Sequence, residues 1–248
     1  MLPIGLHLVK KFVLFNTIIV LEYLLKIMSG TICKKIVSNE ELEVCRRGIK
    51  ESGRKNGGNS MGERCSWAKT ELSKAYHDAE WCVPLHDDQK LFEMLILEGM
   101  QAGLTWELVL KRREAMREAF DGFDPVKIAA YDEARLKELK ANPKLIRNRL
   151  KLAALPVNAK AFMKVQDEYG SFDEYIWQFV EGRQIINHWQ DVTEMPAEDQ
   201  LSRWISKDLK KQGFKFVGPT ICYSFMQGAG LVDDHVVHCP WHSNNKAD

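Results

Sequence analysis

Two pairs of cysteine and histidine, at opposite ends of the main body of the chain, constrain its fold more than any other feature. Cys65 and His77 lie in "ERCSWAKTELSKAYHDAEW", and His235 and Cys239 lie in "LVDDHVVHC". Structural zinc sites use four such ligands in a tetrahedron. His235 and Cys239 would lie about one helical turn apart, whereas Cys65 and His77 need the fold to bring them together. We expect these four residues to bind one structural zinc ion, which would join the first segment of the body to the last.

Each pair alone is weak support for a metal site, because a lone buried cysteine usually acts as a small hydrophobe. A lone histidine is usually a satisfied polar group, and His238 and His242 lie close by without belonging to the expected set. The six cysteines of the 248-residue chain are irregularly spaced, and a chain of this length needs no disulfide staples. Without a convincing secretory signal, we interpret the cysteines as thiols or metal ligands.

The first sixty residues differ in composition from the rest of the chain. Their apolar run "FVLFNTIIVLEYLL" contains Asn16 and Glu22 and is shorter than the roughly 20 residues of a membrane span. The run has a signal-peptide outline but only a poor cleavage site. Residues 51–60 have the composition of a flexible linker, and Met61 resembles a fresh N-terminus. We expect residues 1–60 to be a dispensable leader or a misassigned start, with a weak membrane anchor as the alternative.

Helix caps and helical periodicity dominate the sequence from Asp87 onward. Asp87 precedes a segment whose apolar residues recur at helical spacing, and Asp124 is followed by Pro125, so both aspartates are candidate N-caps. Gly213 follows another helical segment and is a candidate helix end. No sustained alternation of apolar and polar residues appears, and no Asn-Gly turn joins two strand candidates. The pattern predicts an all-α fold of many short helices. The expected helical segments are 87–101, 105–120, 124–131, 171–182, 198–213 and 218–230.

Glu98 is the most informative charged residue of this body. It shares the apolar face of its helix with Leu91 and Leu95, where an unpaired carboxylate is costly. One interpretation is that the helix frays before Glu98 and the carboxylate reaches solvent. The other is a binding pocket with a single acceptor group at its floor. The aromatic residues that would wall such a pocket are Trp67, Tyr76, Trp81 and Trp106.

The segment "GFKFVGPT" is expected to join two helices by a short turn. The first amides of a helix and its positive dipole end bind anions such as phosphate. Lysines surround this turn, although the whole chain has a net charge of only +1 and so requires a local patch to bind nucleic acid. An ordinary turn with solvated lysines is the alternative. The candidate contacts with DNA are Lys211, Lys215, Val217, Gly218 and Thr220.

Several of these segments together resemble one protein family over about residues 62–241. They are "ERCSW", "AYHDAEW", "LFEMLILEGMQAGLTW", "LIRNRLK", "GFKFVGPTICYSFMQ" and "DDHVVHC". Their residues, order and spacing resemble the bacterial 3-methyladenine DNA glycosylase I family, Tag type. The resemblance implies a helix-hairpin-helix glycosylase fold in residues 61–242, followed by a tail at 243–248. It also implies a structural zinc at Cys65, His77, His235 and Cys239.

The same resemblance implies that Glu98 and the four aromatic residues bind the damaged base, with Glu98 as the catalytic group. It implies that Gly103 and Leu104 form a wedge that enters the DNA stack. The expected activity is hydrolytic release of 3-methyladenine from double-stranded DNA with alkylated adenine, by a monomer of the bacterial cytoplasm without an obligate protein partner. A zinc-stabilised, damage-sensing DNA-binding module without catalysis is the alternative.

Some residues depart from the family pattern or leave a role open. Ser73 stands where some members have a tyrosine, and Cys82 replaces a glycine after Trp81. "VDDH" is similar to a catalytic motif of other helix-hairpin-helix glycosylases, which makes Asp233 a secondary candidate. No lysine follows Val217 and Gly218, where lyase-type relatives place their nucleophile, so a bifunctional glycosylase/lyase is disfavoured.

Overall fold

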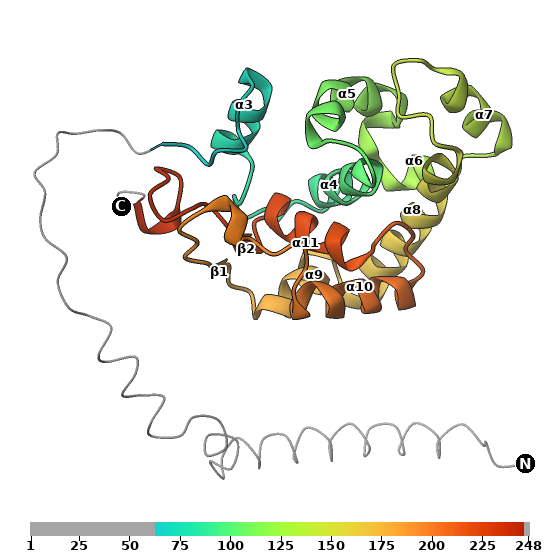
Figure 1. Ribbon diagram of the computed structural model, residues 1–248. Helices are drawn as coiled ribbons and strands as arrows, with labels where there is room; N and C mark the ends of the chain where they lie inside the picture. The colour runs from blue at the N-terminus through green and yellow to red at the C-terminus, as the bar shows by residue number, and fades with distance from the viewer. Residues whose placement is uncertain (1–62, 246–248) are drawn as a thin grey trace, which may run out of the picture. The chain divides into compact units, whose positions relative to one another are not determined.

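The computed structural model describes residues 63–245, which form a predominantly helical body (Figure 1). The expected leader, Met61 and the last three residues of the tail lie outside this part. Within it, the α-helices are α3 (Glu71–Ala79), α4 (Asp88–Gln101), α5 (Trp106–Ala119), α6 (Pro125–Ala129), α7 (Glu133–Ala141), α8 (Arg149–Tyr169), α9 (Phe172–Trp177), α10 (Gln200–Gln212) and α11 (Pro219–Gly228). Short 3-10 helices are η1 (Asp121–Phe123), η2 (Gln178–Val180), η3 (Val192–Glu194) and η4 (Ser243–Asn245).

The helix starts follow from the capping residues of the sequence. The Asp87 side chain accepts a hydrogen bond from the amide of Lys90 at the start of α4. Asp124 caps α6 in the same way, with Pro125 at the first helical turn. Gly213 ends α10 in the left-handed conformation, with φ of 106°. Each local prediction of a boundary at these residues is therefore confirmed.

Three helices were not expected from the pattern: α3, α7 and α8. α3 begins with a capping box in which Thr70 and Ser73 bond each other's backbone amides. Ser73, one of the departures from the family pattern, thus has a clear local role. α8 begins at the cap Asn148 and continues through Pro156, a residue that normally disfavours a helix interior. The all-α expectation also misses a minimal parallel strand pair, β1 (Ile185–Ile186) with β2 (Val232–Asp233).

Helix α4 lies at the centre of the fold. Every residue from Leu91 to Met100 is buried, and α5, α8, α9 and α11 pack against the helix. Figure 1 shows α4 between α5 on one side and α11 on the other. Most residues from Leu91 to Met100 are apolar, but Glu93 and Glu98 lie among them and are buried as well. The position of Glu98 is thus a direct consequence of the packing of α4.

The segment after α3 packs directly against the last turn of α11 and the residues that follow it. The amide of Cys82 donates to the carbonyl of Gln227 at 2.9 Å. Cys82 has a φ of 59°, a conformation that glycine adopts more easily, which accounts for the glycine expected at this position. Gly230 approaches the backbone of Val83 so closely that an added Cβ would lie 2.3 Å from its carbonyl carbon. The two ends of the body are therefore in backbone-to-backbone contact.

Among the described residues, no helix combines the length and apolar character needed to cross a bilayer.

We expect Gly230→Ala to destabilise the protein by at least about 2 kcal/mol, because its Cβ has no space against the Val83 backbone. Gly182→Ala is the matched control, since Gly182 has a similar φ of 69° but nothing within 4 Å of an added Cβ. Urea unfolding of both variants measures the difference. Equal losses of stability would show that backbone strain alone matters at Gly230.

Candidate functional site

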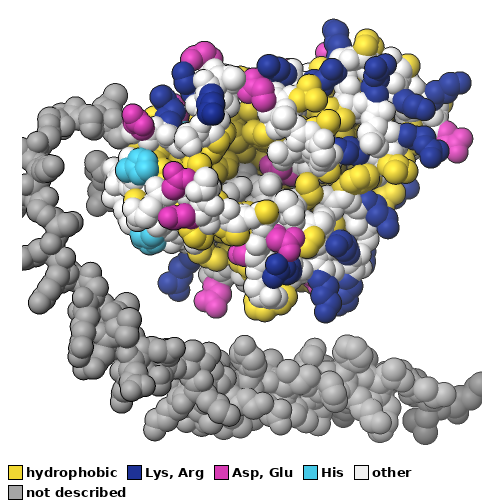
Figure 2. Space-filling model, viewed as in Figure 1, with side chains coloured by type: hydrophobic (Ala, Val, Ile, Leu, Met, Phe, Trp, Pro, Cys, Tyr) yellow, Lys and Arg dark blue, Asp and Glu magenta, His cyan; other side chains and the backbone are white. Residues whose placement is uncertain are grey.

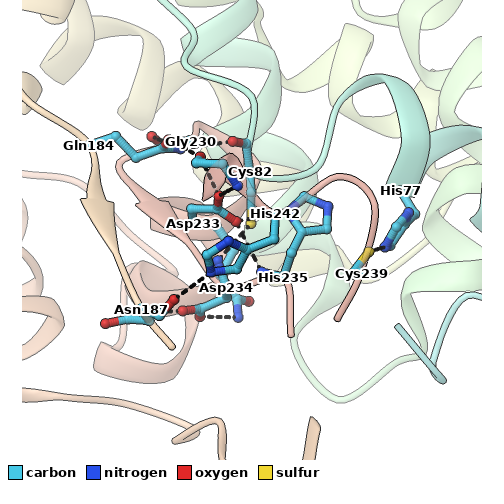
Figure 3. A network of polar contacts seen from close by, with 12 residues as sticks. His77, Cys82, Gln184, Asn187, Gly230, Asp233, Asp234, His235, Cys239 and His242 are labelled. Carbon is cyan, nitrogen blue, oxygen red and sulfur yellow. Dashed lines mark hydrogen bonds and ion pairs between the residues drawn. The ribbon is translucent and has the colours of Figure 1, made fainter. Parts of the chain in front are cut away.

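Three of the four expected metal ligands form a tight buried cluster. Cys65 precedes α3, His77 lies in the last turn of α3, and Cys239 lies in the C-terminal segment. The ligand atoms of these residues lie within 4.8 Å of one another. The Sγ atom of Cys239 is 3.6 Å from Nε2 of His77. Figure 3 shows the two side chains facing each other. The fold thus brings together residues from both ends of the body.

His235, the fourth expected ligand, lies against this cluster with one ring nitrogen unsatisfied. Its ring centroid is 4.8 Å from that of His77. Nδ1 of His235 is 2.8 Å from Oδ1 of Asp233, whereas its buried Nε2 has no hydrogen-bond partner among the described residues. Nδ1 of His77 is likewise 2.9 Å from Asp78. Histidines that bind metal usually pair their other nitrogen with a carboxylate, so this donor set fits a zinc ion.

The two cysteine sulfurs of the cluster are electrostatically linked. A hydrogen bond from the Cys65 thiol and a second contact with His77 lower the pKa of Cys239. The same sulfur-to-sulfur bond, together with burial, raises the pKa of Cys65. A thiolate is the form of cysteine that binds metal. Cys239 is therefore the sulfur that most readily presents an anionic ligand in this arrangement.

The carboxylates beside the cluster are held in place by further contacts. Arg64 donates from Nε and Nη2 to Asp78 and lies over the ring of Trp241 at 4.8 Å. Asp233 accepts hydrogen bonds from the backbone and the side chain of Ser243. Because its remaining oxygen faces His235, the carboxylate of Asp233 supports a histidine rather than facing open space (Figure 3).

Asp234 is a buried carboxylate that the sequence reasoning missed. Its oxygens accept from Asn187 and Trp189 on one side and from Tyr223 and Gln227 on the other, at 2.6 to 2.8 Å. Its backbone amide also lies 3.3 Å from Sγ of Cys82. The four donors fully occupy the carboxylate, so Asp234 joins the segment after β1, helix α11 and the C-terminal segment. The doubled aspartate in "VDDH" was the available signal.

Glu98 is buried, and the interpretation in which α4 frays before it is wrong. The helix continues to Gln101, and only 3% of Glu98 is exposed. Its Oε2 atom has no hydrogen-bond partner among the described residues. Burial raises the pKa of this carboxyl to about 8. Such a group is a candidate functional residue, because it retains a costly unsatisfied acceptor.

The four predicted aromatic residues form one contiguous group, which we call the aromatic cluster: Trp67, Tyr76, Trp81 and Trp106. The ring of Trp67 lies 6.4 Å from that of Tyr76 and 4.9 Å from that of Trp81. Tyr76 lies 5.2 Å from Trp106. Burial raises the pKa of Tyr76, and the charge of Glu98 raises it further, so the carboxylate is close to the cluster.

The aromatic cluster also contains unsatisfied donors. The buried Nε1 atoms of Trp67 and Trp106 have no hydrogen-bond partner within the described part of the chain. Together with Glu98 they offer two donors and one acceptor among aromatic faces. Figure 2 shows that the surface is hollowed between α3 and α5 and that hydrophobic side chains line the hollow. Apolar walls with a few directed polar groups are typical of a small-molecule or base-binding site.

Trp81 connects the aromatic cluster to the cysteine and histidine cluster. Its ring stacks on His77 at 5.7 Å with an interplanar angle of 26°. It also meets His235 edge-on at 4.8 Å. The side chain is almost fully buried. The position of Trp81 is thus determined jointly by both histidines.

The loop after α4 exposes the expected wedge residues. Gly103 has a φ of 74°, which turns the chain sharply, and Leu104 is 39% exposed. A large apolar side chain at a loop tip is available for contact with a partner.

The five candidate residues in and beside the turn between α10 and α11 lie in different environments. Lys211, Lys215 and Thr220 are exposed. Gly218 is the N-cap of α11 and provides no side-chain cap, which leaves the first amides of the helix available. Val217 is buried, so only its backbone can face a ligand from this turn.

Comparisons with known proteins agree on one family. The family model described as methyladenine glycosylase matches residues 67–242. The chain is 47% identical to DNA-3-methyladenine glycosylase 1 of Escherichia coli (strain K12) over 185 residues, covering 74% of this chain and 99% of that relative.

Solved structures of similar proteins share the fold. A crystal structure of 3-methyladenine DNA glycosylase I (TAG) has a TM-score of 0.71 at 46% identity, covering 73% of this chain and 100% of that chain. A single-residue variant of 3-methyladenine DNA glycosylase I in complex with 3-methyladenine has a TM-score of 0.71 at 35% identity, covering 75% and 99%. The body of residues 63–245 therefore has an all-α glycosylase fold.

The buried carboxyl of Glu98 predicts a pH-dependent contribution to stability. Between an unfolded pKa of 4.5 and a folded pKa of about 8, the folded state holds the proton more tightly than the unfolded state. Stability should therefore fall as the pH rises through this window. In Glu98→Gln that loss should be absent. Urea unfolding across the window, with the exposed Glu118→Gln as control, measures the difference; parallel curves for wild type and Glu98→Gln would contradict it.

Proposed function

The chain belongs to the methyladenine glycosylase family, and we propose that it removes 3-methyladenine from alkylated double-stranded DNA by hydrolysing the bond between base and sugar. The observation that carries this proposal is the unsatisfied carboxylate of Glu98 beside an aromatic cluster with two unsatisfied indole donors. A planar base with hydrogen-bonding edges matches this combination. A damage sensor without catalysis is not favoured, because the similar proteins are named glycosylases.

The base must leave the duplex before it can reach the aromatic cluster. The exposed side chain of Leu104 would fill the space that the flipped nucleotide vacates, with Gly103 providing the turn. The amides at the start of α11 and the lysines Lys211 and Lys215 would bind phosphates, in the manner of a helix-hairpin-helix. Such contacts position the protein without reading sequence.

The chemistry needs little acid catalysis. A 3-methylated adenine is cationic in the nucleotide and leaves as a neutral base, so its glycosidic bond is already weakened. Tryptophan and tyrosine faces attract a cationic ring by about 0.5–2 kcal/mol per contact. Trp67, Tyr76 and Trp106 therefore favour the damaged base over neutral adenine. Water attacks the sugar carbon as the bond breaks, and its proton passes to solvent.

Glu98 acts on both the base and the sugar. A cationic base beside it lowers the pKa of the carboxyl from about 8 and favours the ionised form. The carboxylate then accepts a hydrogen bond from the base edge and stabilises positive charge that develops on the sugar. The carboxylate does not need to become covalently attached to the sugar.

A structural zinc held by Cys65, His77, His235 and Cys239 completes the proposal. A bound ion would supply cross-linking and no catalytic step, since protein ligands would fill all four positions. The orphaned Nε2 of His235 supports this assignment. Asp78 and Asp233 orient the two histidines, which in turn contact Trp81. The two histidines thus stabilise the position of Trp81 in the aromatic cluster.

Glu98→Gln should lower single-turnover release of methylated adenine from alkylated duplex by roughly tenfold or more, equivalent to about 1.4 kcal/mol of transition-state stabilisation. The substrate is intrinsically labile, so measurable activity should remain. At subsaturating protein concentration, where the rate reports the free protein, the wild-type rate should rise with pH toward about 8 as Glu98 ionises, and the variant should lose this dependence. Trp106→Ala should compound the loss by removing one aromatic wall. Wild-type rates and free-base affinity in Glu98→Gln would refute the role of this carboxylate.

Purified protein should contain about one zinc per chain, and Cys239→Ser should lose metal and thermal stability together. Cys222→Ser is the matched control, because Cys222 is an equally buried thiol outside the cluster. It should retain zinc with only a modest loss of stability. Elemental analysis and thermal unfolding, with and without chelator, measure both effects. A metal-free wild type that a chelator leaves unchanged would eliminate the zinc proposal.

A further inference from the structure

Helix α8 carries two buried polar side chains on one face, and neither belongs to the site described above. Lys151 and Asn158 are about two helical turns apart, so they project from the same side of the helix. Only 6% of Lys151 and 4% of Asn158 is exposed. Both use their side chains to bind backbone atoms of other elements. The two elements they bind are the loop after α4 and the turn between α10 and α11.

Lys151 binds the end of α4. Its Nζ donates to the carbonyl of Met100 at 2.8 Å and to that of Ala102 at 2.6 Å. The carbonyls at a helix C-terminus are unsatisfied and carry the negative end of the dipole, which favours a cation. The last turn of α4 contains no basic residue of its own, so the cation comes from Lys151 of α8, which is remote in the sequence. The bonded carbonyls directly precede Gly103 and Leu104.

Asn158 binds the turn between α10 and α11. Its amide nitrogen donates to the carbonyl of Lys215 at 3.1 Å, and its amide oxygen accepts from the backbone amide of Lys215 at 2.7 Å. This paired contact fixes the plane of the backbone at Lys215. Ser206 adds a third bond, donating to the carbonyl of Val217 at 2.6 Å. The following Phe216 adopts a left-handed φ of 57°.

The same turn also touches α4. An added Cβ at Gly99 would lie 3.4 Å from Cβ of Phe216, so the turn packs on the residue that follows Glu98. α8 itself packs against both α4 and α10 (Figure 1). The end of α4, the turn between α10 and α11, and α8 therefore meet at one place. A displacement of the turn or of the loop after α4 changes the distance between that segment and Glu98.

We propose that Lys151 and Asn158 are positioning residues that set the spacing between the Leu104 loop and the Lys215 turn. The inference rests on the proposed function, in which Leu104 enters the DNA stack and the turn binds phosphate. Flipping requires both contacts on one duplex at the same time. Misplacement by about 1 Å can reduce a rate by two orders of magnitude, so fixing two flexible segments to one rigid helix has a direct effect on catalysis.

The first test changes the contact of Lys151. Lys151→Met keeps a similar length and removes the cation, and the exposed Lys160→Met on the same helix is its control. We expect Lys151→Met to lower release from alkylated duplex by about tenfold or more, while binding of free 3-methyladenine stays within about twofold of wild type. The fluorescence increase of a 2-aminopurine duplex, which reports unstacking, should fall in parallel with the rate. The salt dependence of DNA binding should not change, because the phosphate contacts remain.

The second test changes the contact of Asn158. Asn158→Leu removes both bonds without adding charge, and the smaller, neutral Asn158→Ser also removes the paired contact. We expect both variants to weaken duplex binding and to flatten its salt dependence, as Lys211→Ala with Lys215→Ala should do. Free-base binding should again remain. If Asn158→Leu does not fold, the uncharged Asn158→Ser provides the same comparison.

The results separate several outcomes. Wild-type flipping and release in Lys151→Met would overturn the inference and leave the proposed function intact. Loss of free-base binding and thermal stability in step with release would also overturn it, because the two residues would then be merely structural. A wild type that releases no methylated base would refute the proposed function, and the inference would fall with it.

Discussion

The burial of every residue from Leu91 to Met100 in helix α4 is the constraint on which the site depends. Four other helices enclose this stretch, so a carboxylate within it must find a partner inside the protein or remain unsatisfied. Glu93 finds such partners in Arg113 and Arg117. Glu98 does not, and its carboxyl holds its proton to about pH 8. The cost of desolvation is the physical basis of its response to a cationic ligand, which offers the missing counter-charge.

A second constraint comes from the joining of the two ends of the body. Gly230 lies against the Val83 backbone, and the Asp234 amide contacts Cys82, so these segments have almost no freedom to shift. The cysteine and histidine cluster lies at the same junction. Because Trp81 contacts both His77 and His235, this junction and the aromatic cluster form one continuous packed unit. Anything that loosens the junction should therefore change the walls around Glu98.

Local sequence signals predicted much of the fold and the components of the site. The caps Asp87 and Asp124 and the terminating Gly213 marked helix boundaries correctly, because capping depends on hydrogen bonds to residues within one turn. Cys65, His77 and Cys239 were identified by residue type and converge as expected. Helices α3, α7 and α8 were missed. α8 contains Pro156, which argued locally against the helix that tertiary packing stabilises.

Contacts between distant segments decided what each residue does. The sequence placed Glu98 on an apolar face, but whether it frayed into solvent or remained unsatisfied depended on the helices packed around it. Asp233 and Asp234 are adjacent and chemically identical, yet one supports His235 and the other is fully occupied by four donors. The partners of Lys151 and Asn158 are backbone atoms of remote segments, which carry no residue-type signal. The sequence by itself thus determined most of the helices and most of the reactive groups. Only the tertiary structure decided which of them are satisfied, because hydrogen-bond satisfaction in a core depends on neighbours that are far apart along the chain.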